Sequence, residues 1–341
     1  MNIRNILAAL VSVVMLSTLS LSPAWAKSHS GTIAMSVDLS AHDPAGEAEV
    51  WIPYPVSDND QAITDVKISG DFATSAVYTD ANYSTPMLYA RWNKDAKSRK
   101  LSFVYKADRK EVLRRDFPAK ETAWNPTDYA RYLAPTALGP VDGEVGRLAK
   151  TIVAGKTTVL EKAKAIYDWT CDNTYRDPKT RGCGAGDVCL LLKNPGGKCA
   201  DIHSVFVALA RAAGVPAREV FGIRMGKKER EDISTWQHCW AEFFLPGYGW
   251  VPVDAADVRK AMLTDNLKLE DSKTKELRAY FWGGIDPYRV KLGMGRDLTL
   301  NPPQPGKPVN YLMYPFGRVG EKTLDWLDPA TFKYTITYTA Q

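Results

Sequence analysis

The spacing of apolar residues changes near residue 145, and this change constrains the fold of the chain more than any other feature of its sequence. From residue 27 to about residue 108, apolar and polar residues alternate between short turns rich in glycine, proline and aspartate. Such alternation predicts β-strands with one buried face. Beyond residue 145 apolar residues recur every three or four positions, which predicts amphipathic helices. We therefore expect an α+β protein with an all-β region followed by a mixed region.

Strand candidates fill the amino-terminal region, 27–108, and together predict a small antiparallel, sandwich-like domain. Its six segments are 33–39, 48–52, 63–68, 74–78, 87–92 and 101–105. Prolines at positions 118, 126, 135 and 140 then mark a connecting segment over 109–144.

The region 145–260 is expected to form a second domain, in which helices and strands are mixed. Helical spacing runs from Val145 to about Asp172, with a break near Gly155. After a glycine-rich loop, a long helix is predicted from Cys199 to Ala213, where Gly214 ends it. Strands follow at 217–223, 237–244 and 250–253. The rest, 261–341, is expected to be a carboxy-terminal extension that ends in a strand over 332–339.

The first 26 residues have the pattern of a signal peptide. Arg4 precedes an apolar run over 6–21, and Ala24-Trp25-Ala26 fits the small-x-small pattern that signal peptidase accepts. The run is shorter than the roughly 20 residues that span a bilayer, which disfavours the alternative of an uncleaved membrane anchor. We expect cleavage after Ala26, export to the periplasm or the extracellular space, and no stable membrane anchor afterwards.

Charge and motifs exclude several classes of partner. The formal net charge is only +5, without long basic blocks, so no nucleic acid partner is expected. The chain has no phosphate-binding loop, calcium loop or dinucleotide fingerprint, and we expect neither a cofactor nor a metal.

Cys199 is the strongest candidate for a reactive residue. It follows Gly196-Gly197-Lys198 at the first turn of the predicted helix, where free backbone N–H groups and the helix dipole favour an anion. A thiol placed there ionises more readily, and the thiolate is the nucleophilic form. Its own N–H group could stabilise an oxyanion. A buried half-cystine or an inert core cysteine is the alternative.

His238 and Asp254 favour the catalytic interpretation of Cys199. His238 lies on a predicted strand, and Asp254 lies at the end of the next strand, after a short turn. A hairpin of this kind can hold a carboxylate beside an imidazole and so fix its tautomer while the imidazole accepts the thiol proton. Among the other histidines, His203 is one helical turn beyond Cys199 and either lines the site or packs beneath it.

These residues resemble the transglutaminase-like superfamily. The matching segments are Gly-Gly-Lys-Cys-Ala-Asp-Ile-His over 196–203, Leu-Ala-Arg-Ala-Ala-Gly-Val-Pro-Ala-Arg over 209–218, His-Cys-Trp-Ala-Glu over 238–242 and Gly-Trp-Val-Pro-Val-Asp over 249–254. The resemblance implies a papain-like core, with a nucleophile helix packed on an antiparallel sheet. It also implies that Cys199, His238 and Asp254 act as nucleophile, base and orienting acid. Tyr175, upstream of the nucleophile, is the best positional candidate for an oxyanion-binding side chain.

The chain has five cysteines, an odd number for an exported chain, so the other four can pair while Cys199 is left over. Cys183 and Cys189 could close a small disulfide, with Cys171 and Cys239 free or paired. Cys239 alternates with His238 and is expected to be buried on the opposite face of its strand. A zinc site is disfavoured because the chain contains no Cys-x-x-Cys pair.

Three functions are compatible with these residues. A thioester at Cys199 can be resolved by water, as in a peptidase, isopeptidase or amidase, or by a lysine amine, as in a crosslinking transglutaminase. The third is a binding module that has kept the fold without the activity. We expect hydrolysis, because the sequence contains no recognisable amine site, and a protein or peptide substrate for which the cell envelope is one source.

Overall fold

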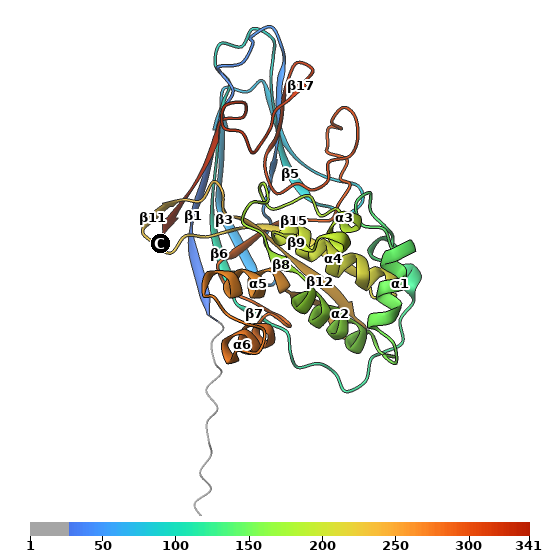
Figure 1. The fold of residues 1–341 in the computed structure, drawn as a ribbon. Helices are drawn as coiled ribbons and strands as arrows, with labels where there is room; N and C mark the ends of the chain where they lie inside the picture. Colours follow the sequence, from blue (N-terminus) through green and yellow to red (C-terminus); the bar gives the residue numbers. More distant parts are fainter. Residues whose placement is uncertain (1–26) are drawn as a thin grey trace, which may run out of the picture.

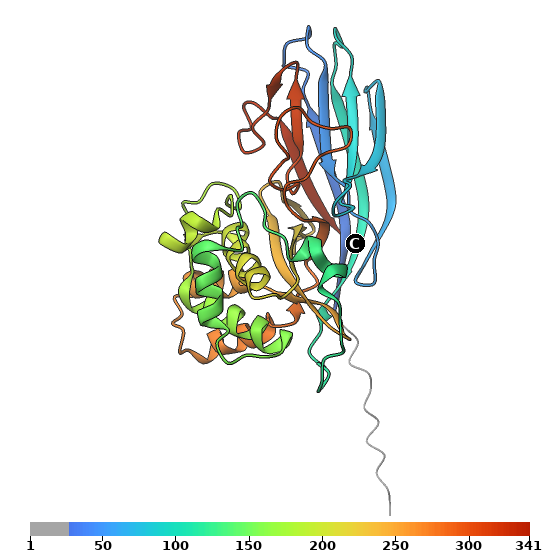
Figure 2. The same cartoon turned by 90° about the vertical axis from the view of Figure 1, so that its right-hand side faces the viewer.

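The computed structural model describes residues 27–341, so the predicted signal peptide lies outside the described residues. Helices and strands are mixed, which confirms the α+β class. Long strands form an elongated sandwich, and the helices gather beside one end of it (Figures 1 and 2). Within residues 27–341, no helix has both the length and the apolar content needed to cross a bilayer.

Two five-stranded antiparallel sheets form the sandwich. Their inner faces enclose a core that includes Trp92, Phe103 and Ile336. The first sheet has the order β11 (Arg230–Asp232), β18 (Tyr334–Ala340), β1 (Ser28–Asp38), β6 (Lys100–Lys110) and β3 (Gln61–Gly70). The second has the order β17 (Lys322–Thr323), β16 (Phe316–Val319), β2 (Ala48–Pro53), β5 (Pro86–Trp92) and β4 (Thr74–Thr79).

Strands from the end of the chain complete both sheets of the sandwich. β18 pairs with β1, and β16 pairs with β2, so the predicted last strand lies beside the first one. β11 lies in sequence between two strands of the mixed region, which extends over residues 112–294, and it pairs with the other side of β18. These pairings connect the sandwich with the mixed region.

The mixed region contains a four-stranded antiparallel sheet with the order β13 (Gly249–Val253), β12 (Gln237–Leu245), β10 (Ala217–Arg224) and β15 (Arg289–Met294). Helix α4 (Cys199–Ala212) packs on this sheet, and thirteen of its fourteen residues are buried. Around α4 lie α1 (Gly143–Ile152), α2 (Val159–Asn173), α3 (Val188–Lys193) and α5 (Ala255–Thr264), with α6 (Ser272–Tyr280) against α5. One 3-10 helix and two pairs of short strands complete the region. They are η1 (Pro126–Tyr132), the pair β7 (Val112–Leu113) and β14 (Gly284–Ile285), and the pair β8 (Tyr175–Arg176) and β9 (Gly196–Gly197).

Local sequence explains where these helices begin and end. The predicted break near Gly155 is confirmed, because α1 ends at Ile152 and α2 begins after Thr158, whose side chain forms a capping box with Glu161. Helix α3 forms where the sequence predicts a loop. The Asp187 side chain accepts a hydrogen bond from the Leu190 backbone N–H, and one face of α3 is buried.

Candidate active site

Cys199 is the first residue of α4 and lies at the wall of a cleft of about 770 Å³. Its side chain is only 2% exposed, and His238 lines the same cleft. The predicted helix start is thus confirmed, and it places the thiol where the helix dipole favours its ionised form.

The backbone around Cys199 leaves one N–H group free. The Lys198 N–H donates to Asp201 Oδ2 at 3.0 Å, and the Ala200 N–H donates to the Cys183 carbonyl at 2.9 Å. The Cys199 N–H has no protein acceptor among residues 27–341. Gly197 permits this close packing, since a Cβ atom there would lie 2.4 Å from Asp201 Cβ. The free N–H group can therefore donate a hydrogen bond to the negatively charged oxygen that forms when the thiol attacks a carbonyl group.

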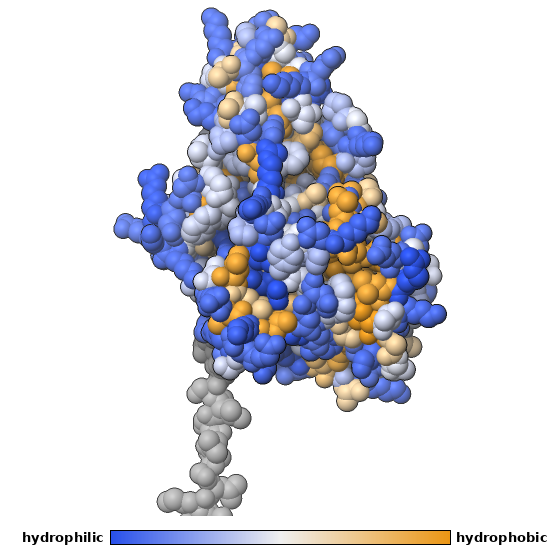
Figure 3. Space-filling model, viewed as in Figure 1, coloured by the Kyte–Doolittle hydropathy of each residue, from blue (hydrophilic) through white to orange (hydrophobic). Residues whose placement is uncertain are grey.

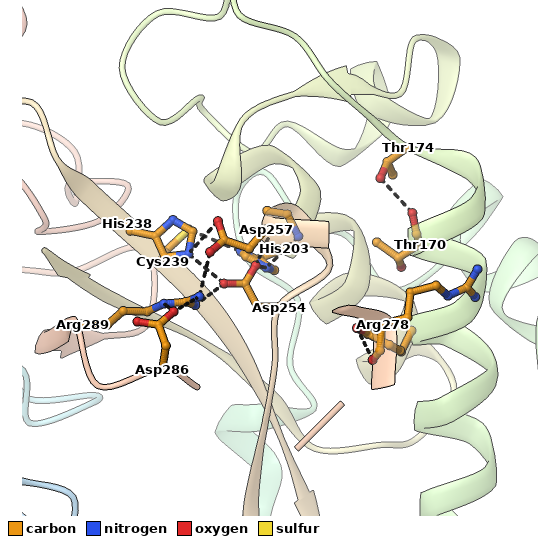
Figure 4. A network of polar contacts seen from close by, with 12 residues as sticks. Thr170, Thr174, His203, His238, Cys239, Asp254, Asp257, Arg278, Asp286 and Arg289 are labelled. Atoms are coloured by element: carbon orange, nitrogen blue, oxygen red, sulfur yellow. Dashed lines mark hydrogen bonds and ion pairs between the residues drawn. The ribbon is translucent and has the colours of Figure 1, made fainter. Parts of the chain in front are cut away.

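His238 and Asp254 meet as the sequence predicts (Figure 4). His238 lies on β12, and Asp254 lies between β13 and α5. The distance from His238 Nε2 to Asp254 Oδ2 is 2.7 Å, and His238 lies close enough to Cys199 to lower the pKa of its thiol. Because Nε2 contacts the carboxylate, Nδ1 is the nitrogen left to accept the thiol proton.

Asp254 is completely buried among positively polarised groups. Its Oδ2 also contacts Arg289, while its Oδ1 lies 3.2 Å from His203 Nε2 and accepts a hydrogen bond from the Asp257 N–H at 2.7 Å. Burial alone would raise the pKa of Asp254, but Arg289, His238 and His203 outweigh it and hold that pKa well below its ordinary value. The carboxylate therefore stays ionised beside His238. The sequence left open whether His203 lines the site or packs beneath it. In the structure it packs beneath the site and contacts Asp254.

Opposing effects act on His238. Burial, and then the charge of Arg224, lower its pKa, but the carboxylates of Asp257 and Asp254 more than offset them. The pKa of His238 is raised above its ordinary value, so these carboxylates stabilise the imidazolium that forms when the ring accepts a proton.

Two other thiols, those of Cys183 and Cys239, stabilise the Cys199 thiolate. Hydrogen bonds from Cys183 and then Cys239 lower the pKa of Cys199, burial opposes them, and His238 adds to their effect. The result is a pKa well below the ordinary range for a cysteine. The same contact with Cys199, together with burial, raises the pKa values of Cys183 and Cys239. Of the three neighbouring thiols, Cys199 is the one that ionises.

All five cysteines are free thiols in the structure. The small disulfide that the sequence permits between Cys183 and Cys189 is not formed, because Cys189 is exposed on α3 whereas Cys183 is buried beside Cys199. The Cys183 sulfur also lies 3.4 Å from the Gln237 carbonyl oxygen and accepts a hydrogen bond from the Tyr314 hydroxyl at 3.2 Å. As expected, Cys239 is fully buried, with its sulfur 3.5 Å from His203 Nδ1.

Comparison with known proteins agrees with this geometry. Residues 146–255 match the family model of the transglutaminase-like superfamily. An uncharacterised protein of Haemophilus influenzae is 36% identical over 315 residues, which cover 85% of each chain. The chain belongs to the transglutaminase-like superfamily. The resemblance inferred from the sequence is thus confirmed.

One solved structure shows a fold similar to that of this transglutaminase-like chain. The crystal structure of a Cytophaga hutchinsonii protein, provisionally described as a cysteine protease, aligns with a TM-score of 0.53 and 16% identity. The alignment covers 92% of this chain and 98% of that one, so the fold likeness includes the sandwich. The periplasmic domain of TgpA from Pseudomonas aeruginosa aligns with a TM-score of 0.36 and 13% identity, over 73% of this chain and 92% of that one.

The site of this transglutaminase-like protein includes charged residues that the sequence reasoning missed. Arg289 on β15 contacts Asp254, and it lies 2.7 Å from both Asp257 and Asp286 (Figure 4). Arg224 contacts Asp257 at 2.5 Å. One local signal was available, because Asp257 follows Asp254 by one helical turn. Arg289 comes from a distant strand, and no spacing in the sequence links it to the site.

Tyr175 and four aromatic residues close to His238 in the sequence lie in different places. The Tyr175 hydroxyl is 2.9 Å from Asn194 Oδ1, and its exposed ring stands over Gly196; its oxyanion role stays a prediction. Trp236 lines the cleft, whereas Trp240 is buried in a small core cluster. Two others pack away from the cleft, Trp250 under the Arg218 guanidinium and Tyr248 against Phe117.

One group of residues has the composition of a metal site. Ligand atoms of His238, Asp254 and Asp257 lie within 4.8 Å of one another. However, Arg289 already contacts both carboxylates, and its guanidinium supplies the positive charge that a metal ion would bring. The arrangement can hold a catalytic histidine without a metal.

Proposed function

We propose that this transglutaminase-like protein hydrolyses amide bonds, in a glutamine carboxamide, a peptide or an isopeptide, through a thioester at Cys199. The observation that carries the proposal is the 2.7 Å contact between His238 and Asp254, with the Cys199 thiol beside the same imidazole at the wall of an open cleft. The Cytophaga hutchinsonii protein of similar fold, described as a cysteine protease, supports a peptide substrate.

The reaction follows from these contacts. His238 holds the proton taken from Cys199, and the thiolate attacks the carbonyl carbon of the amide. The tetrahedral intermediate that forms carries a negatively charged oxygen, which accepts a hydrogen bond from the Cys199 N–H. The intermediate collapses as the C–N bond breaks and His238 donates its proton to the leaving amine. Water, deprotonated by His238, then attacks the thioester and releases the acid and the thiolate. Asp254 keeps the imidazole oriented and stabilises its charged form.

The charge of the cleft supports hydrolysis over transfer to an amine. An acceptor lysine would have to bring an ammonium group past the basic residues of the cleft wall, and the acidic residues there already have partners. The basic residues are Arg176, Lys198, Arg224, Lys227, Lys228 and Lys260, and the acidic ones are Glu231, Asp257 and Asp286. A water molecule is uncharged, so the basic residues do not repel it. Amine transfer and a non-catalytic binding module remain the competing functions.

We also propose that the protein acts after export, in the periplasm or outside the cell, on a protein or peptide. The support is the amino-terminal signal pattern of the sequence. Fractionation of cells that produce the full chain is expected to recover a processed protein beginning at Lys27. Recovery of the unprocessed chain in the membrane would contradict this proposal.

Product analysis separates hydrolysis from transfer. The protein beginning at Lys27 is incubated with a glutamine-containing peptide or casein and a labelled primary amine. We expect acid product, or cleaved peptide, to form faster than the amine is incorporated, since nothing in the cleft binds an ammonium group. Amine incorporation at a rate equal to or above acid release would establish a transferase. The Cys199→Ala protein, assayed in parallel, corrects for any contaminating activity.

A further inference from the structure

The walls of the cleft in front of Cys199 carry more basic than acidic residues. The basic residues come from different elements: Arg176 from β8, Lys198 from the residue before α4, and Lys260 from α5. Arg176 lies opposite Gly197 in the β8 and β9 pair, two residues from the nucleophile. Positive side chains from several elements therefore line the cleft that Cys199 faces.

The acidic residues of the cleft do not neutralise these cations. Asp257 contacts Arg224 and Arg289, and Asp286 contacts Arg289 at 2.7 Å. The Glu231 carboxylate accepts hydrogen bonds from the backbone N–H groups of Lys227 and Lys228, at 2.6 and 2.9 Å. Every acidic side chain in the cleft wall therefore already has an arginine or a backbone N–H group as its hydrogen-bond donor.

Among the described residues, five of the six basic side chains of the cleft, all except Arg224, have no acidic partner. Within residues 27–341, no carboxylate oxygen lies within 4.0 Å of the charged nitrogens of Arg176, Lys198 or Lys260. Burial, followed by the charge of Arg224, lowers the pKa of Lys260, and Arg176 acts in the same direction. Cations that repel one another at the mouth of a cleft are stabilised when a carboxylate binds between them.

A second cavity, of about 330 Å³, continues the cleft past Lys198. Lys198, Gly182 and Gln237 line both cavities, and aromatic residues including Trp326 and Phe332 line the second one. In Figure 3, blue and pale residues separate two orange areas on the lower half of this face. The path suits an extended chain with charged groups near Cys199 and apolar groups farther along.

We propose that the substrate is an acidic peptide, whose carboxylates next to the reactive amide bind Arg176, Lys198 and Lys260. This inference rests on the proposed function, because it names the substrate of the same site. Each cation is at least partly exposed, so each contributes modestly and the three act together. Flanking lysines would place ammonium groups against the same cations and weaken binding.

Binding and turnover can be tested separately with three fluorescent peptides. All contain the same central glutamine, flanked on both sides by glutamate, methionine or lysine. Binding is measured by anisotropy with the Cys199→Ala protein, which cannot turn the peptides over. We expect the glutamate peptide to bind about tenfold more tightly than the methionine peptide, and the lysine peptide to bind most weakly. The preference should shrink as salt is raised.

Charge variants identify the residues responsible. In the Cys199→Ala background, Arg176→Gln and Lys260→Gln should each reduce the glutamate preference by about threefold. The matched control, Lys150→Gln, changes an exposed lysine on α1 outside the cleft and should leave the preference unchanged. Equal binding of the glutamate and methionine peptides, tighter binding of the lysine peptide, or no measurable binding of the glutamate peptide would overturn the inference.

Turnover by the protein with Cys199 intact tests the proposed function separately. If the glutamate peptide binds preferentially but yields neither acid nor cleaved product, the proposed hydrolysis fails while the assignment of an acidic ligand stands. If all three peptides bind equally and are turned over equally, hydrolysis stands and the acidic substrate is wrong.

Discussion

The Cys199→Ala protein should lose amide hydrolysis by roughly five to six orders of magnitude in kcat, because the thioester cannot form without the thiol. Cys199 lies beside Cys183 and Cys239, so neighbouring thiols remain in the variant. Neither should replace it, because burial raises the pKa values of both thiols and neither lies at the start of α4.

The matched control for this loss is Cys189→Ala, which removes an exposed thiol on α3. Its kcat should equal that of the unmodified protein, and both variants should keep the same melting temperature to within a few degrees. If the Cys199→Ala protein retained more than about a thousandth of the activity, another nucleophile would carry the reaction.

The Asp254→Asn protein should keep its fold and lose about two to four orders of magnitude in kcat, with a smaller change in KM. An amide can donate to His238 through its nitrogen and so favour the wrong tautomer, and it cannot stabilise the imidazolium. Asparagine suits this test better than alanine, because Asp254 also caps α5 and contacts Arg289. Losing the cap alone costs about 1 kcal/mol, and alanine would also remove one of the three carboxylates that contact the buried Arg289.

Asp257→Asn is the matched control for Asp254. Asp257 Oδ1 lies 3.8 Å from His238 Nε2, compared with 2.7 Å for Asp254 Oδ2, so its loss should lower kcat much less. Kinetics and thermal melting are measured on both variants, with and without a chelator. Equal losses from the two substitutions would contradict the assignment of Asp254. Activity that requires an added divalent metal would instead point to the cluster of His238, Asp254 and Asp257 as a metal site.

The positions of Cys199, its helix and the His238 hairpin could be predicted because their signals are local. Glycines before Cys199, apolar spacing through α4 and alternation along β12 each occupy one short segment. Helix α6 carries a weaker signal, since most of its residues are polar and its only buried residue is Thr274. The sequence reasoning did not predict it.

The remaining parts of the site depend on long-range contacts. Arg289 reaches Asp254 from β15. Cys183 reaches Cys199 from a loop in which the sequence instead permitted a disulfide with Cys189. The pairing of β18 with β1 likewise joins opposite ends of the described chain. Such contacts are set by tertiary packing, and no periodicity in a single sequence specifies them.

The central claim is that Cys199 is an ionised thiol beside His238, and alkylation tests it without any knowledge of the substrate. The protein is treated briefly with iodoacetamide between about pH 5 and pH 9, and modification of all five cysteines is mapped by mass spectrometry. We predict that at about pH 6 Cys199 is modified faster than the other cysteines, including the more exposed Cys189. We also predict that His238→Ala shifts the pH dependence of Cys199 modification to higher pH. Modification of Cys199 no faster than that of Cys189 at this pH, with a profile that His238→Ala leaves unchanged, would contradict the claim.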